Sequence, residues 1–166
     1  MFCLDAARFT GGMSNSPVVY LAAAAAVSAA AVGGLFYAFS TFVMRGLDRT
    51  GPDDAATAMR GINAEAQANA PFLAMFFGSA LLALIVGIAA LMQLHLAGSG
   101  WIVAGAVLAL VPLVVTVAVN VPLNDRLASG ALPWLDYYRT WTVWNHVRSV
   151  APLLGSVLMV IGVRLR

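Results

Sequence analysis

The chain has 166 residues, of which 61% are hydrophobic and only 10% are charged. An ordinary soluble domain contains about 25% charged residues, so this composition excludes one. The formal net charge of +2 does not indicate nucleic acid as a partner, and the length suits one domain. We therefore expect a single membrane domain whose main partner is the lipid bilayer. The sequence does not define an oligomeric state.

Residues 1–17 are predicted to form an N-terminal tail, and this tail contains the single cysteine, Cys3. One thiol cannot close an internal disulfide. Arg8 and the alanines that follow it also fit a secretory signal peptide, which is the competing interpretation. The apolar run continues from Val18 to Met44, however, and that length favours a retained membrane helix over a cleavable segment.

Four apolar segments are each close to the length of a membrane-spanning helix. A helix of about 20 residues crosses a hydrocarbon core of about 30 Å, and it satisfies its own backbone hydrogen bonds inside lipid. The predicted spans cover about residues 18–44, 70–92, 101–121 and 142–163. The sequence therefore predicts an all-α fold: an integral membrane four-helix transmembrane bundle over residues 18–166.

The connections between the predicted spans differ in length and polarity. A short turn joins the second and third spans, whereas the other two loops carry most of the polar residues. Pro52, followed by two acids, is typical of a helix start. Pro133 begins a similar segment in the other long loop. We expect short extramembrane helices at both places, each running straight into the span that follows it.

Four spans place the two long loops on one side of the membrane and both termini on the other. Arginines on the long-loop side outnumber those on the opposite side. They are Arg45, Arg49, Arg60, Arg126 and Arg139, against Arg8, Arg164 and Arg166. The positive-inside rule then favours a multi-pass protein of the cell membrane with its long loops in the cytoplasm.

Polar residues gather near the long-loop end of the predicted bundle. A first cluster precedes the second span and alone is typical of a polar interfacial helix with an ordinary cap; it consists of Ile62-Asn63, Gln67, Asn69 and Pro71. Thr116, Asn120 and Asn124 are four residues apart, so they share one helix face. Pro122 leaves one carbonyl without its donor and predicts a kink or the end of the helix. Hydrogen bonding between helices is a sufficient explanation for Thr116. For the two asparagines, hydrogen bonding between helices and a functional role are equally open.

A further polar cluster opens the fourth span. It runs from Tyr137 to Arg148 and includes Trp141, Trp144, Asn145, His146 and Arg148. A span of sufficient length must begin near residue 142, which draws the histidine and the arginine about one turn into the membrane. An ionisable group at that depth usually faces the bundle interior. The alternatives are snorkelling of the arginine, its cation–π packing on the tryptophans, and an aromatic belt. The adjacent His, Asn and Arg favour a functional site.

Several other kinds of site do not fit the pattern. His95 lies at the opposite end of the bundle from His146, so the two imidazoles cannot bind a haem together. Neither an HExxH motif nor a Cys–His cluster supports a metal site. A small multidrug exporter needs an acid in its first span, which contains none here. A channel needs polar side chains along a pore.

Five motifs at these positions are similar to those of a known family. They are Gly34-Leu35-Phe36-Tyr37-Ala38-Phe39-Ser40, Ile62-Asn63, Asn69-Ala70-Pro71-Phe72, Asn120-Val121-Pro122-Leu123-Asn124 and Trp141-Thr142-Val143-Trp144-Asn145-His146-Val147-Arg148. Together they resemble the anthrone oxygenase-like family of small four-helix membrane proteins, from about Val18 to the C-terminus. One departure is Ala70, because the family tends to have proline directly after the asparagine.

The resemblance implies a reaction and a set of residues. An anthrone is a lipophilic tricyclic aromatic ketone with an acidic methylene, and O₂ oxidises it to the quinone without a metal or flavin cofactor. On this hypothesis His146 removes the methylene proton, and Arg148 or an asparagine stabilises the enolate oxygen. The predicted catalytic residues are His146, Arg148, Asn120 and Asn124, and the predicted substrate-binding residues are Asn63, Asn145, Trp141, Trp144 and Phe36.

A non-catalytic membrane protein is the alternative. Such a protein could bind a quinone or lipid, or act as an accessory subunit of a larger membrane complex. The His–Arg pair favours an enzyme or a binding protein, whereas the small size and the missing cofactor motifs favour the accessory role.

Overall fold

The computed structural model describes residues 17–166, so the predicted N-terminal tail, with Cys3 and Arg8, lies outside the described residues except for Pro17. Within residues 17–166 the secondary structure is helical, without strands. Helical stretches long and apolar enough to cross a membrane cover Pro17–Asp48, Ala70–Leu91, Ser99–Ala128 and Trp134–Arg164. The predicted all-α, four-span membrane bundle is confirmed.

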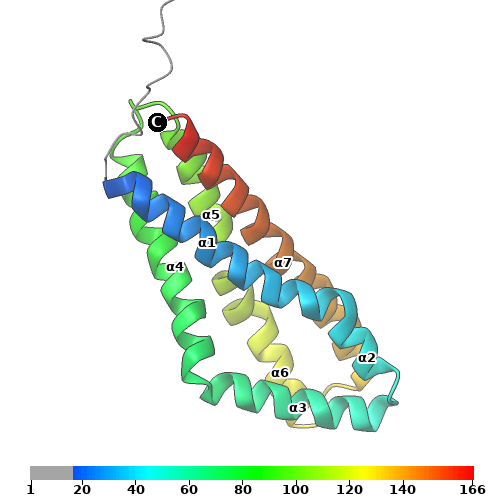
Figure 1. The fold of residues 1–166 in the computed structure, drawn as a ribbon. Coiled ribbons are helices and arrows are strands. Elements are labelled where there is room, and N and C mark those ends of the chain that lie inside the picture. Colours follow the sequence, from blue (N-terminus) through cyan, green and yellow to red (C-terminus); the bar gives the residue numbers. More distant parts are fainter. Residues whose placement is uncertain (1–16) are drawn as a thin grey trace, which may run out of the picture.

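The bundle is a ring of four membrane helices, each of which packs against two neighbours (Figure 1). Helix α7 (Trp134–Arg164) packs against both α1 (Pro17–Ala38) and α5 (Ser99–Val115), and α4 (Ala70–Leu91) packs against α5 and α1. The core at the end of the bundle that carries the C-terminus is made mostly of alanine and other small residues. Its buried members include Ala22, Ala25, Ala29, Ala83, Val86, Ala90, Ile102 and Met159. Small side chains allow the helix backbones to approach closely at this end.

Close approach is most pronounced between α5 and α7. A Cβ atom added at Gly105 would lie 2.5 Å from the carbonyl oxygen of Gly155, and one at Gly155 would lie 2.6 Å from that of Gly105. Only glycine fits both positions. This tight contact fixes α7 against α5 and leaves no space between them in that half of the bundle.

The first and third spans are longer than predicted because each passes through one π-helical turn. Helix α1 continues through η2 (Phe39–Val43) into α2 (Met44–Asp48), and α5 continues through η3 (Thr116–Asn120) into α6 (Val121–Ala128). A kink or the end of the helix was expected at Pro122; the helix does not end there but passes through a π turn directly before the proline. The wider turn closes with the Val121 N–H donating to the Thr116 carbonyl, and Pro122 then lies in the first turn of α6.

The predicted helix between the first two spans exists as α3 (Pro52–Ala68), which begins after Gly51 at a φ of 95°. It does not run straight into the second span, so that prediction is wrong. Asn69 is extended (φ −81°, ψ 98°), and its Oδ1 accepts a 2.9 Å hydrogen bond from the N–H of Phe72. The side chain thereby caps α4, and α3 lies across the end of the bundle (Figure 1). The segment from Trp134, in contrast, runs without a break into the fourth span, as predicted.

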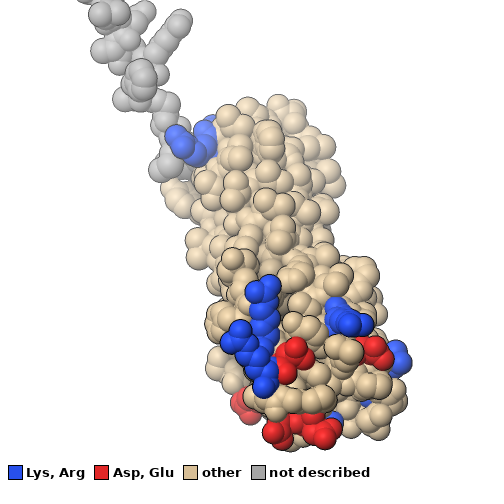
Figure 2. Space-filling view, turned by 90° about the vertical axis from the view of Figure 1, so that its right-hand side faces the viewer, with Lys and Arg blue, Asp and Glu red and all other residues tan. Residues whose placement is uncertain are grey.

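Charged side chains gather at the end that carries α3. Figure 2 shows arginines and acids there, above them a broad band without charge, and a further arginine group at the opposite end. Large apolar side chains are exposed along the band, among them Leu81, Ile88, Val107, Leu154 and Val157. An apolar surface of this kind suits contact with lipid.

Candidate functional site

A cavity of about 730 Å³ lies in the half of the bundle that carries α3. This volume is within the range of small-molecule sites, which is roughly 300–1,000 Å³. Residues from α1, η2, α3, α4, η3, α6 and α7 line it. Helix α3 thus covers the cavity at one end. At its other end the cavity stops where the small residues of the core bring the helices close together.

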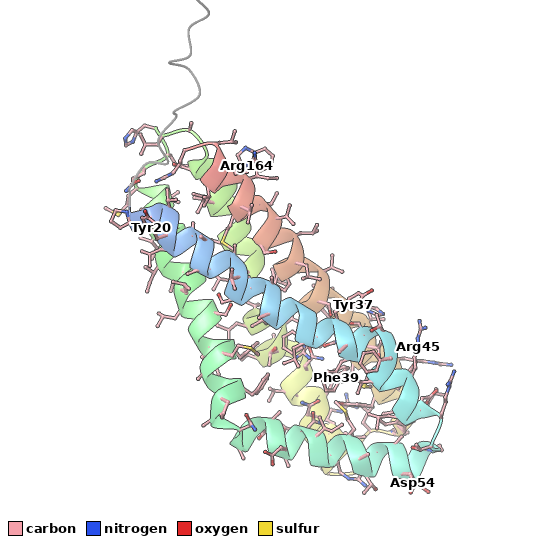
Figure 3. The ribbon with its side chains drawn as sticks, viewed as in Figure 1. Tyr20, Tyr37, Phe39, Arg45, Asp54 and Arg164 are labelled. Atoms are coloured by element: carbon pink, nitrogen blue, oxygen red, sulfur yellow. The ribbon has the colours of Figure 1, made fainter. Side chains whose placement is uncertain are left out.

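Aromatic rings form much of the cavity wall. Phe36 meets Phe76 edge to face at 6.0 Å between ring centroids, and Phe72 stacks on Phe76 at 5.9 Å. Phe39 also lines the cavity, whereas Tyr37, two residues earlier, is 54% exposed on the outer surface (Figure 3). Flat rings on several sides of an apolar space suit a flat aromatic ligand.

Arg148 of α7 is the charged group buried in this wall, with 5% of its surface exposed. Its Nη2 and Nε donate to Asn145 Oδ1 at 2.8 and 3.3 Å, and its Nη1 donates to Thr116 Oγ1 at 3.0 Å. The guanidinium carbon lies 4.0 Å from the ring centre of Phe36 and 5.1 Å from that of Trp141. The side chain is therefore held inside the bundle and does not snorkel to the surface.

The charge of Arg148 is not neutralised by an acid. No carboxylate of residues 17–166 forms an ion pair with it. An arginine has five N–H donors, and three of them are used in the bonds to Asn145 and Thr116. An unpaired charge in an apolar surrounding is costly, and it interacts strongly with any anion that comes close.

Asn145 holds Arg148 in position. Its Oδ1 accepts the two arginine bonds, and its Nδ2 donates at 2.8 Å to both the Phe36 carbonyl and Ser40 Oγ. Ser149 Oγ lies 3.0 Å from Ser40 Oγ and donates to the Asn145 carbonyl at 2.8 Å. The amide of Asn145 is fully buried and does not line the cavity. It positions the arginine and does not contact a ligand there.

Both π-helical turns contact this group. Ser40 lies in η2, and Thr116 opens η3. Thr116 Oγ1 donates to the Pro112 carbonyl at 2.6 Å, which turns its lone pairs toward Arg148. Single π turns inside α-helices occur often at functional sites. Here they bring a serine and a threonine from two spans to the Asn145–Arg148 pair of a third.

Asn124 of α6 is held by two donors. Its Oδ1 accepts from the Tyr137 hydroxyl at 2.8 Å and from Trp141 Nε1 at 3.0 Å. Tyr137 is fully buried, and Asn63 of α3 approaches its hydroxyl. Asn63, Asn124 and Trp141 all line the cavity. The polar side chains of α3, α6 and α7 thus meet at one wall.

The structure brings together five of the nine residues selected from the sequence. Phe36, Asn63, Asn124, Trp141 and Arg148 line the cavity. Asn120 is fully buried but does not line it, and its amide nitrogen and oxygen find no partner in the described part of the chain. Thr116 lines the cavity and Asn120 does not, although both lie in the π turn η3.

Trp144 and His146 lie outside the cavity. Trp144 is 39% exposed, and His146 lies on the exposed face of α7 beside Val147 and Val150. Residues two apart on an α-helix point about 200° away from each other, so His146 and Arg148 cannot face the same space. The predicted base role of His146 therefore has no support in this geometry.

The site residues selected from the sequence did not include Tyr137, Ser40 or Glu65, although Tyr137 begins the polar cluster of the fourth span and Ser40 ends the motif of the first. Tyr137 precedes Trp141 by four residues and Asn145 by eight, which is the helical spacing of a common face, so that signal was available. Glu65 is the carboxylate among the lining residues, and it is exposed. Within residues 17–166, His, Cys, Asp and Glu side chains do not form groups of three that could hold a metal ion.

The fold and the site define a small multi-pass membrane protein with an aromatic cavity around a buried arginine. Residues 72–158 match the family model for anthrone oxygenase. The match covers just over half of the chain, which therefore belongs to the anthrone oxygenase family. It includes Asn124, Trp141 and Arg148 of the site. The comparisons with curated proteins and with solved structures found no match.

Proposed function

We propose that this protein is a membrane-embedded oxygenase that converts a lipophilic anthrone-like ketone into a quinone with O₂ and without a cofactor. The observation that carries the proposal is Arg148: a buried cation without an acidic partner among the described residues, in the wall of an aromatic cavity. Such a group lowers the energy of a negative charge that forms on a bound ligand.

The reaction begins with loss of a proton from the methylene of the ketone. The electron pair of the broken C–H bond delocalises onto the carbonyl oxygen and gives an aromatic enolate. Arg148 stabilises this oxygen, and the apolar surroundings strengthen the attraction. The charge also favours the bound enolate over the neutral ketone, which is the difference that accelerates the step.

Oxidation follows by electron transfer from the enolate to O₂. The products are a carbon radical and superoxide, which combine at the former methylene carbon to form a C–O bond. Protonation gives a hydroperoxide. Loss of the remaining C–H proton and cleavage of the O–O bond then release water and leave a second carbonyl. The ketone is oxidised to the quinone, and one O₂ is reduced to one quinone oxygen and one water.

Glu65 is the proton acceptor in this proposal. It is the carboxylate that lines the cavity, and its exposure gives the proton a route to water. His146 takes no part, because it faces away from the cavity.

A lipophilic substrate reaches the cavity from the bilayer. Phe77 of α4 and Val121 of α6 line the cavity and are also 52% and 38% exposed. Helix α4 packs along α5 but does not contact α6. The space between α4 and α6 therefore gives a flat apolar molecule a lateral route from the lipid.

The membrane in this proposal is the cell membrane, and the α3 end faces the cytoplasm. Arginines at that end support the orientation, because cytoplasmic loops carry an excess of positive residues. They are Arg45, Arg49, Arg60, Arg126 and Arg139, against Arg164 and Arg166 at the other end.

The test is oxygen uptake by the purified protein in lipid nanodiscs, with a panel of anthrones and hydroquinones. We expect uptake with an anthrone, formation of one quinone per O₂ consumed, and the same rate after treatment with a metal chelator. A folded sample that consumes no O₂ with any member of the panel overturns the proposal. The alternative of a non-catalytic module that binds quinone or lipid then takes its place.

A further inference from the structure

We infer that Asn124 is a second ligand-binding group, which together with Arg148 selects flat ligands that present hydrogen-bond-accepting oxygens to the wall formed by α6 and α7. The inference rests on the cavity of the proposed function and names the class of molecule that the cavity takes. It concerns recognition, and it does not depend on any oxidation step.

The orientation of the Asn124 amide follows from its partners. An indole N–H can only donate a hydrogen bond, so the Asn124 atom 3.0 Å from Trp141 Nε1 must be the oxygen. The Tyr137 hydroxyl donates to the same oxygen at 2.8 Å. Two donors thus fix Oδ1, and the NH₂ group is directed away from them.

The NH₂ group of Asn124 has no acceptor among residues 17–166. The residue lines the cavity and is not fully buried. Its two N–H bonds are therefore available to a molecule in the cavity. A donor that is held in place by two other bonds is preorganised for binding, since little freedom remains to be lost.

Acceptors on the same wall are already used. Thr116 Oγ1 and Asn145 Oδ1 accept from Arg148, and Asn124 Oδ1 accepts from Tyr137 and Trp141. Arg148 has N–H groups left over and cannot accept. The groups that Thr116, Asn124, Asn145 and Arg148 bring to the wall therefore offer donors and no free acceptor. A ligand with a carbonyl or phenolate oxygen satisfies these donors, whereas a ligand N–H at the same place finds no partner.

This pattern also orients a tricyclic ketone. Glu65 and Gln67 of α3, which carry acceptor oxygens, also line the cavity, whereas Asn63 of the same helix approaches Tyr137 at the α6–α7 wall. With the ketone oxygen at Arg148 and Asn124, the carbon across the central ring points away from the α6–α7 wall. In an anthrone that carbon is the acidic methylene. The donors thus direct the reactive C–H bond away from themselves and toward the remaining sides of the cavity, among them α3 with Glu65.

The test measures binding of molecules that cannot be oxidised as an anthrone is. Xanthone has the ketone oxygen and no methylene, and carbazole is a flat tricycle with an N–H donor in place of the oxygen. Binding to the protein in nanodiscs is followed by titration calorimetry. We expect xanthone to bind at least about tenfold more tightly than carbazole, because the buried donors stay unpaired with carbazole. Equal affinities overturn the inference.

The variant Asn124→Asp sharpens the test. It keeps an oxygen for Tyr137 and Trp141 but replaces the free NH₂ by a second acceptor. We expect the preference for xanthone over carbazole to fall by about tenfold or more. The control Ser129→Asp adds the same charge at the exposed end of α6 and should leave the preference unchanged.

An unchanged preference in a folded Asn124→Asp protein, judged by its melting temperature, refutes the role of Asn124. Should that variant not fold, the comparison of xanthone with carbazole on the natural protein still decides. Failure of the proposed oxidation is separate: a protein that prefers xanthone but consumes no O₂ supports the binding site and not the reaction.

Discussion

Replacement of Arg148 by methionine removes the guanidinium charge and keeps a long unbranched side chain in the same place. We expect a large loss of activity. Removal of one preorganised donor to a developing oxyanion costs about 2.7–4 kcal/mol, or about 10²–10³ in rate. Arg148 supplies the full charge together with its remaining N–H donors, so the rate of quinone formation should fall by at least that factor.

Stability should change much less than activity. The substitution leaves Asn145 Oδ1 without its two donors, which costs about 1–3 kcal/mol. It also removes contact of the charge with the rings of Phe36 and Trp141, worth about 0.5–2 kcal/mol. Removal of the guanidinium charge stabilises the fold, because it relieves the cost of burying an unpaired charge. It also leaves no opposite charge unpaired. The opposing effects should leave a net destabilisation of about 2 kcal/mol or less.

The assay combines oxygen uptake and quinone absorbance in nanodiscs with thermal unfolding followed by circular dichroism. Arg139→Met is the matched control, since Arg139 is an exposed arginine of the same helix. We expect natural activity from the control. A folded Arg148→Met protein that retains the natural kcat/KM would refute the enolate-stabilising role. Loss of folding in the variant would instead refute the account of its stability.

Four further predictions concern the rest of the molecule. His146→Ala should leave oxygen uptake unchanged; a large loss would restore the histidine to the reaction. Glu65→Gln should lower the rate at neutral pH by about a hundredfold, with recovery at high pH where the substrate ionises unaided, and an unaltered rate would exclude it as the base. Gly105→Ala places a Cβ 2.5 Å from the Gly155 carbonyl and should destabilise the fold by about 1–3 kcal/mol in a thermal melt, unless α5 and α7 can separate freely. Val121→Trp should raise KM more than it lowers kcat, and unchanged kinetics would argue against the lateral route.

The spans could be predicted from the sequence because lipid imposes a strong requirement. A long apolar run must satisfy its backbone inside the membrane, and only a helix does so within one segment. The helix ends were less predictable. Composition does not reveal a π turn, so the first and third spans were drawn too short. The polar cluster with Asn69 and Pro71 indicated a cap before the second span, and Asn69 is that cap, although the preceding helix was expected to run straight on.

The site was partly accessible for a similar reason. The required length of the fourth span drew Arg148 below the surface, and the structure has it buried. His146 was grouped with Arg148 because the two are close in the chain. Asn145 and Arg148 follow Trp141 by four and seven residues, which is the spacing of one helix face, whereas His146 follows it by five and lies on another face. The hydrogen bonds of Asn124 to two aromatic side chains depend on the packing of α6 against α7, which no local pattern reveals.

The surroundings of Arg148 explain why an asparagine and not an acid holds it. A carboxylate in place of the Asn145 amide would pair with the guanidinium and make its burial less costly. It would also cancel the charge that the cavity presents to a ligand. Asn145 Oδ1 and Thr116 Oγ1 accept hydrogen bonds without bringing a negative charge, and Asn145 is itself held by Ser40 and the Phe36 carbonyl. The full positive charge therefore remains for a ligand that becomes an anion after it has bound.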